Sequence, residues 1–110
     1  MANRKQREIA SAHIREIART IKEKFNPRRV ILFGSYAYGV PATKGRGNDI
    51  DLFVIMNTSL PVKKQAFLIR REITSSIPLD VIVRTPEQVE ERLKLGDFFI
   101  KKIMEKGVDL

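Results

Sequence analysis

Two aspartates at the start of an apolar segment are the residues best suited to chemistry. Asp49 and Asp51 open the segment Ile50–Met56, which is otherwise almost continuously apolar. In a β-strand the side chains alternate between faces, so Asp49 and Asp51 would point the same way with Cα atoms roughly 6–7 Å apart. Two carboxylates at that spacing can converge on one or two divalent cations. Mg²⁺, which keeps water and substrate phosphates among its ligands, typically binds to oxygens of this kind.

A third aspartate stands in the same early position of another apolar segment. Asp80 lies between Leu79 and Val81 in the segment Leu79–Arg84. A charge within an apolar strand is costly unless it is paired or binds a metal. A solvated strand end would explain a single aspartate, and each of these residues could be only that. Three together favour a metal site.

The residues Gly34 and Ser35 end an earlier apolar segment abruptly. Gly34 lets the backbone turn where a ligand must approach closely. Ser35 is predicted to begin a short helix through Tyr38, where backbone N–H groups and the hydroxyl would form a cradle for phosphate oxygens. A plain N-cap role for Ser35 is the alternative. The segment is not a P-loop, because Val40 stands where that motif requires lysine.

Together these residues form a recognisable pattern. Gly34-Ser35, a variable loop and then Asp49-x-Asp51 at a strand start resemble the signature of the nucleotidyltransferase superfamily that includes DNA polymerase beta. The small size resembles more narrowly the minimal nucleotidyltransferases, which are one-domain prokaryotic proteins. The resemblance covers nearly the whole chain. Two departures are the long loop between Ser35 and Asp49, and Asn48 where a serine often precedes the first aspartate.

The resemblance implies a fold and a set of ligands. The fold would be α/β, with a small mixed β-sheet packed against helices and the acidic residues gathered at one edge of one face. Asp49 and Asp51 would hold two Mg²⁺ ions, and Asp80 would be the third carboxylate, either as a metal ligand or as the acceptor of the hydroxyl proton. Gly34 and Ser35 would bind the β- and γ-phosphates of a nucleoside triphosphate, with ATP as the expected substrate.

The resemblance also implies a partner. Larger relatives select their acceptor with a second helical domain, and 110 residues leave no room for one. Minimal nucleotidyltransferases commonly pair with a small helical HEPN protein as toxin and antitoxin, and can transfer AMP to a tyrosine of that partner. The alternatives are a toxin-masking module without catalysis, a small-molecule nucleotidyltransferase of the aminoglycoside type, and a nucleic-acid binder.

Composition narrows the remaining classes. The length predicts one domain over residues 1–110, and 43% hydrophobic with 31% charged residues is typical of a globular protein. The chain has no cysteine, so a disulfide framework and a cysteine metal site are excluded. It shows no signal peptide and no apolar run long enough for a membrane helix, so a cytoplasmic location is expected. The net charge of +8 favours anionic partners, but the basic residues are spread along the chain, which makes nucleic acid the weaker choice.

Hydrophobic periodicity and capping residues predict the elements that position these side chains. The loop 39–48 is glycine-rich, and its Lys44 and Arg46 are either solvated charges or residues that close on the triphosphate. The last helix has more apolar residues than one core stripe needs, so it either exposes some of them to a partner or packs them all. The predicted helices cover 3–25, 35–38, 61–75, 86–95 and 98–106, the predicted strands cover 29–33, 50–56 and 79–84, and an extended tail covers 108–110.

Overall fold

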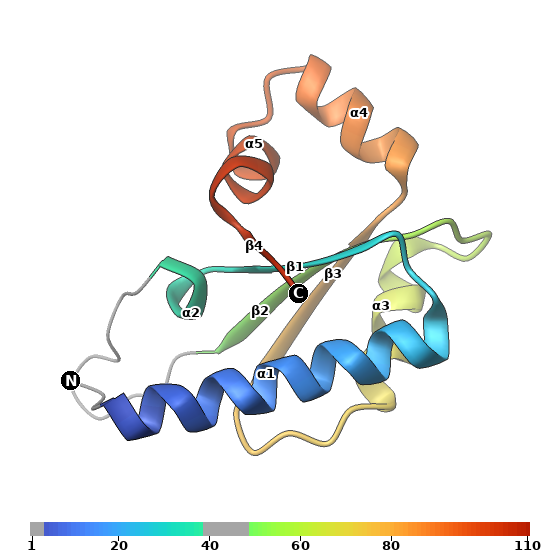
Figure 1. The fold of residues 1–110 in the computed structure, drawn as a ribbon. Coiled ribbons are helices and arrows are strands. Elements are labelled where there is room, and N and C mark those ends of the chain that lie inside the picture. The colour runs from blue at the N-terminus through green and yellow to red at the C-terminus, as the bar shows by residue number, and fades with distance from the viewer. Residues whose placement is uncertain (1–3, 39–48) are drawn as a thin grey trace.

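The computed structural model describes residues 4–38 and 49–110. Within these residues the chain forms five helices and four strands in one small α/β domain (Figure 1). The elements in chain order are α1 (Arg4–Phe25), β1 (Arg29–Phe33), α2 (Ser35–Tyr38), β2 (Ile50–Ile55), α3 (Val62–Arg71), β3 (Leu79–Arg84), α4 (Pro86–Lys94), α5 (Phe98–Lys106) and β4 (Val108–Asp109).

The four strands form one mixed sheet in the order β3-β2-β1-β4. β1 is antiparallel to both β2 and β4, whereas β2 and β3 are parallel neighbours joined by the crossover through α3. The predicted α/β class with a small mixed sheet is therefore confirmed. The predicted tail at 108–110 is more than extended backbone, since Val108 and Asp109 pair with Leu32 and Ile31.

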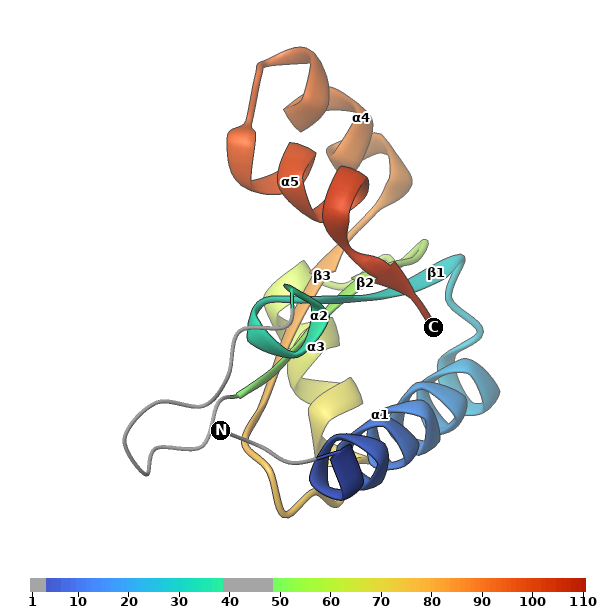
Figure 2. The ribbon, with the colours of Figure 1, turned by 60° about the vertical axis from the view of Figure 1, so that its left-hand side comes forward.

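Helices cover both faces of the sheet (Figure 2). One face packs against α1 and α3, and its core includes Leu32, Leu52 and Val54 together with Ile17 and Ile21 of α1. The other face packs against α4 and α5. Its buried residues are Ile31, Phe33, Phe53, Ile55, Val89, Ile100 and Ile103. Residues of β1 and β2 alternate between these two cores, as the period of a strand requires.

The predicted helix boundaries hold at several caps. Asn26 has a left-handed φ of 48° just after α1, and Gly96 has a φ of 80° after α4. Thr85, Pro86 and Gln88 are a sequence pattern that predicts a capping box, and in the structure the side chains of Thr85 and Gln88 each accept a hydrogen bond from the backbone N–H of the other residue. Asp97 caps α5 by accepting a hydrogen bond from the backbone N–H of Ile100, 3.1 Å away. No helix in residues 4–38 and 49–110 has the length and hydropathy to cross a bilayer.

Two predictions about helices were wrong. The third helix ends at Arg71 instead of near Ser75, because the Ser75 hydroxyl bonds the backbone of Ile77 and forms a turn into β3. The helical period of residues 86–95 also predicts that Leu93 faces the core together with Val89, but 38% of Leu93 is exposed. The reason is the position of α4, which stands away from the sheet so that only Val89 of this helix is buried (Figure 1).

Candidate functional site

The predicted carboxylates lie at one end of the sheet, where β2 and β3 begin. Asp51 of β2 is the direct neighbour of Asp80 on the parallel strand β3, and on its other side it is the neighbour of Phe33 on β1. Paired residues on adjacent strands point to the same face. Asp51 and Asp80 therefore share a face with Phe33, which is the face covered by α5. Because neighbouring strands lie about 4.8 Å apart, the two carboxylates are close to one another.

The surroundings of these aspartates differ. Asp49 comes just before β2 and is exposed, Asp51 is partly buried, and Asp80 is exposed. Burial raises the pKa of Asp51 above its ordinary value, and the negative charges of Asp80 and Asp49 raise this pKa further. Asp51 is therefore the carboxylate on which burial and the charges of both neighbours act together.

Gly34 forms the wall of the site next to Asp51. Its φ of 76° lies in the left-handed region, and a Cβ atom added to it would overlap the Oδ2 atom of Asp51 and lie 3.0 Å from the Cγ atom. The absent side chain of Gly34 is therefore the space into which the Asp51 carboxylate fits. The sequence predicted room for a ligand at Gly34, whereas the structure gives this room to a side chain of the protein itself.

The backbone turns immediately after Gly34. Its carbonyl oxygen accepts hydrogen bonds from the N–H groups of Ala37 and Tyr38, both at 3.0 Å, and this turn forms α2. Ser35 is thereby held at the same end of the sheet as Asp51, one residue beyond the glycine. The two halves of the predicted motif are adjacent in space, although residues 39–48 separate them in the chain. Lys44 and Arg46 lie outside the described residues.

The donor chemistry of this group fits a divalent cation. Carboxylate oxygens are hard ligands, and a cation would offset both the burial and the neighbouring negative charges that raise the pKa of Asp51. Within residues 4–38 and 49–110, no three His, Cys, Asp or Glu side chains are close enough to enclose a metal by themselves. An open site is what Mg²⁺ normally uses, because it takes one or two carboxylates and completes its coordination with water and phosphate.

Helix α5 contributes a side of the site that the sequence did not identify. The ring of Phe99 meets the ring of Phe33 edge to face, with centroids 5.7 Å apart. One turn further along α5, the Nζ atom of Lys102 lies 4.9 Å from the centroid of the Tyr38 ring in α2. The spacing of Phe99, Lys102 and Ile103 indicates one face of a helix. Nothing in the sequence indicates that this face meets the end of β1.

The apolar excess predicted for α5 is largely exposed. Phe98 is 83% exposed, Phe99 is 52% exposed, and Leu95 just before the helix is 68% exposed. Ile100 and Ile103 supply the core contacts. Of the two alternatives for this helix, the described structure therefore supports exposure rather than complete packing.

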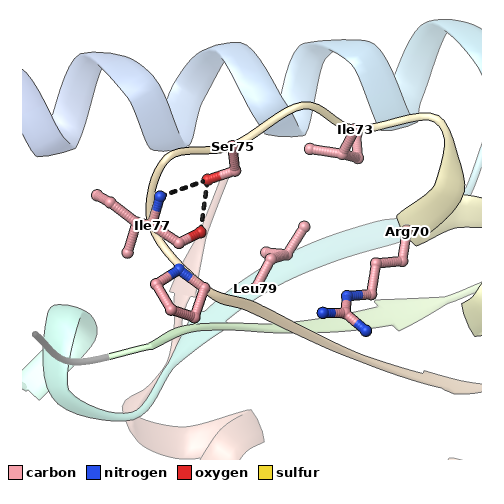
Figure 3. A pocket seen from close by; sticks show the side chains of 6 residues that line it. Arg70, Ile73, Ser75, Ile77 and Leu79 are labelled. Carbon is pink, nitrogen blue, oxygen red and sulfur yellow. Dashed lines mark hydrogen bonds between the residues drawn. The ribbon is translucent and has the colours of Figure 1, made fainter.

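A pocket of about 150 Å³ lies elsewhere, beside the turn between α3 and β3 (Figure 3). Its lining includes Arg70, Ser75 and Leu79. The side chain of Leu79 belongs to the core under α1 and α3, so the pocket opens on the face opposite to the carboxylates. The Ser75 hydroxyl donates to the Ile77 carbonyl, so the 2.9 Å contact with His13 has the histidine Nε2–H as donor. His13 thus has a structural partner and no position in the site.

The small mixed sheet, with Gly34, Ser35 and the three aspartates gathered at one of its ends, is the arrangement that the resemblance to nucleotidyltransferases implied. The sequence model of the nucleotidyltransferase domain matches residues 14–110, and the chain belongs to this family. A structural neighbour is the crystal structure of "a putative nucleotidyltransferase from Sulfolobus solfataricus". It has a TM-score of 0.54 and 19% sequence identity, and the match covers 94% of this chain and 77% of that one. This likeness supports the fold. A search of curated proteins found no match.

Proposed function

We propose that this protein is a Mg²⁺-dependent nucleotidyltransferase that transfers AMP from ATP to a hydroxyl acceptor. The observation that supports this most strongly is the fit between Gly34 and Asp51, which joins the two halves of the family motif into one site. Membership of the nucleotidyltransferase domain family supports the reaction class. The raised pKa of Asp51, caused by burial and by its two carboxylate neighbours, supports a cation as a ligand of this site.

The roles of the residues follow from their positions. Asp49 and Asp51 would hold Mg²⁺, which would supply charge neutralisation to the triphosphate and acidity to the acceptor hydroxyl. Gly34 and Ser35 would hold the β- and γ-phosphates at the start of α2. A new bond forms between the acceptor oxygen and the α-phosphorus, and the bond from this phosphorus to the bridging oxygen breaks to release pyrophosphate. Asp80, which is more exposed than its strand neighbour Asp51, would accept the hydroxyl proton.

The acceptor is proposed to be a protein. Phe99 is exposed and contacts Phe33, the strand neighbour of Asp51, and the nearby chain also exposes Leu95 and Phe98. Exposed apolar side chains of this kind suit a protein partner better than a small sugar-like molecule. A tyrosine of a helical HEPN-type partner is the specific acceptor that we propose, with the antitoxin role that this implies. Masking of such a partner without catalysis is the competing function, and the experiment below separates the two.

The test compares wild type with Asp51→Asn, using Asp109→Asn as the control because Asp109 lies in β4 and pairs with Arg29 away from the site. Each protein is incubated with Mg²⁺, ATP labelled on its α-phosphate and a HEPN-type protein, and the label on the partner is measured. We expect labelling by wild type and by Asp109→Asn, and none by Asp51→Asn or in EDTA. Mg²⁺-ATP should likewise stabilise wild type and Asp109→Asn but not Asp51→Asn. The expected stabilisation is ~2.7 kcal/mol when the ligand is in hundredfold excess over its dissociation constant.

Two results would contradict the proposal. A wild-type protein that neither transfers label nor gains stability from Mg²⁺-ATP is not a nucleotidyltransferase of this kind. If wild type and Asp51→Asn bind the partner equally tightly and neither modifies it, the protein is a masking module. Transfer of label to an aminoglycoside and not to the partner would keep the reaction and replace the acceptor.

A further inference from the structure

We infer that Lys102 binds the polyphosphate of the nucleotide, so that α5 contributes a cation to the site. This inference rests on the function proposed above. It goes beyond it in naming a binding residue on a helix that lies outside the Gly-Ser and Asp-x-Asp motif. Four observations support it: the place of α5, the position of the ammonium group, the pairing of neighbouring charges and the weakness of its present contact.

The first observation is the place of α5 on the sheet. Ile100 and Ile103 are buried against Phe33 and Phe53, on the same sheet face as Asp51 and Asp80. Phe99 contacts Phe33 directly, and Phe33 is the strand neighbour of Asp51. The helix therefore flanks the carboxylates on the side where β1 passes into α2.

The second observation is the position of the ammonium group. Lys102 Nζ lies 4.9 Å from the centroid of the Tyr38 ring, and Tyr38 is the last residue of α2. The Tyr38 N–H donates to the carbonyl of Gly34, so this ring is one short turn from Gly34 and Ser35. A long lysine side chain held over α2 has the reach to meet phosphates bound beside that turn.

The third observation concerns charge. Three of the other four cations of α4 and α5 have acidic partners, in Arg92–Asp97 at 2.9 Å, Lys94–Glu90 at 3.1 Å and Lys101–Glu105 at 4.0 Å. Among the salt bridges of the described residues, none includes Lys102. Its charge is thus available to an anion.

The fourth observation is that the present contact of Lys102 is easily exchanged. A lysine over a tyrosine ring at an exposed position is held weakly. A phosphate oxygen offers a charge-assisted hydrogen bond, which is a stronger contact. Tyr38 would therefore keep the ammonium near α2 in the free protein, and the nucleotide would take it over. The site then has carboxylates that would hold the metal ion and an ammonium group that would bind the phosphates, as transfer from a Mg²⁺-bound triphosphate requires.

The test measures binding of Mg²⁺-ATP and of adenosine by calorimetry to wild type, Lys102→Met, Lys102→Arg and the control Lys101→Met. Lys101 is the preceding residue on the same helix and is similarly exposed. We expect Lys102→Met to weaken Mg²⁺-ATP binding roughly tenfold or more, the loss of a hydrogen bond to a charged group. Adenosine binding should not change, because adenosine has no phosphate. Lys102→Arg should restore most of the affinity, and Lys101→Met should match wild type.

Several results would overturn the inference. The first is that Lys102→Met binds Mg²⁺-ATP with the affinity of wild type. The second is that Lys102→Met loses affinity for adenosine and for Mg²⁺-ATP to the same extent. Equal losses in Lys101→Met and Lys102→Met would indicate general surface charge. A melting temperature equal to that of wild type shows that each variant is folded. Failure of the wild type itself to bind Mg²⁺-ATP would instead overturn the proposed function, so the two failures are distinguishable.

Discussion

At the scale of single residues, Gly34 and Asp51 occupy one shared volume. The Cβ atom of any other residue at position 34 would overlap the Oδ2 atom of Asp51. The left-handed φ of Gly34 adds a second reason for glycine, since other residues rarely adopt it. A glycine that looks like a simple turn residue in the sequence therefore sets the orientation of the central carboxylate.

The shared volume predicts a coupling between substitutions. We expect Gly34→Ala to destabilise the protein by at least ~1–2 kcal/mol, the cost of the left-handed backbone, with a further cost from overlap with Asp51. In an Asp51→Ala background the overlap is absent, so Gly34→Ala should cost less. Urea denaturation of the four proteins measures this difference. An identical cost in both backgrounds would show that the two residues do not compete for space.

The raised pKa of Asp51 predicts how stability depends on pH in metal-free protein. A carboxyl group whose folded-state pKa is raised favours folding while protonated, and this contribution is lost as pH rises from the unfolded pKa, about 4, through the folded value. Asp51→Asn removes the ionisable group, so the variant does not lose this stability as the pH rises. In EDTA at neutral pH we therefore expect the variant to melt at the same temperature as wild type or higher.

The same variant provides its own control at acid pH. Below about pH 4 Asp51 is neutral in both states, so the advantage of Asp51→Asn should disappear there. Melting scans between pH 3 and pH 7 follow it. A variant that is less stable than wild type at neutral pH would mean that Asp51 is held by favourable contacts and not repelled by Asp80 and Asp49.

At the scale of elements, α5 has two surfaces with different roles. Ile100 and Ile103 are buried, whereas Phe98 and Phe99 are exposed at the start of the helix. The sequence predicted the helix, its Asp97 cap and its apolar excess. It could not predict which residues are exposed, because that depends on which sheet face α5 covers. Periodicity identifies an apolar stripe but not the surface that the stripe meets.

This division predicts opposite effects of two truncations. Ile103→Ala should destabilise the protein by about 2–5 kcal/mol, because it opens a cavity under α5. Phe98→Ala should leave stability nearly unchanged and weaken binding to a protein acceptor, since Phe98 is 83% exposed. Chemical denaturation and a binding titration with the HEPN-type partner measure the two effects. A large loss of stability in Phe98→Ala, with normal partner binding, would place Phe98 in the core instead.

At the scale of the whole molecule, the sequence predicted the fold better than the contacts between distant segments. The strands Ile50–Ile55 and Leu79–Arg84 follow from a pattern in which strands alternate with helices. The gathering of Asp80 with Asp51 was implied by the family resemblance, and their direct pairing on parallel strands comes from the structure. The pairing of Val108–Asp109 with β1 does not, because two residues show no period. The meeting of Lys102 with Tyr38 likewise depends on long-range packing.

The order of strand pairing has a consequence for folding. β1 and β2 are consecutive strands, so Gly34 and Asp51 meet through a comparatively short loop closure. Asp80 can pair with Asp51 only when the crossover through α3 has formed. The pairing of β4 with β1 joins segments that are still farther apart in the sequence. Non-local pairings of this kind are made late. The repulsion between Asp51 and Asp80 is therefore felt after most of the chain has collapsed, and Mg²⁺-ATP would stabilise the native state chiefly by slowing unfolding.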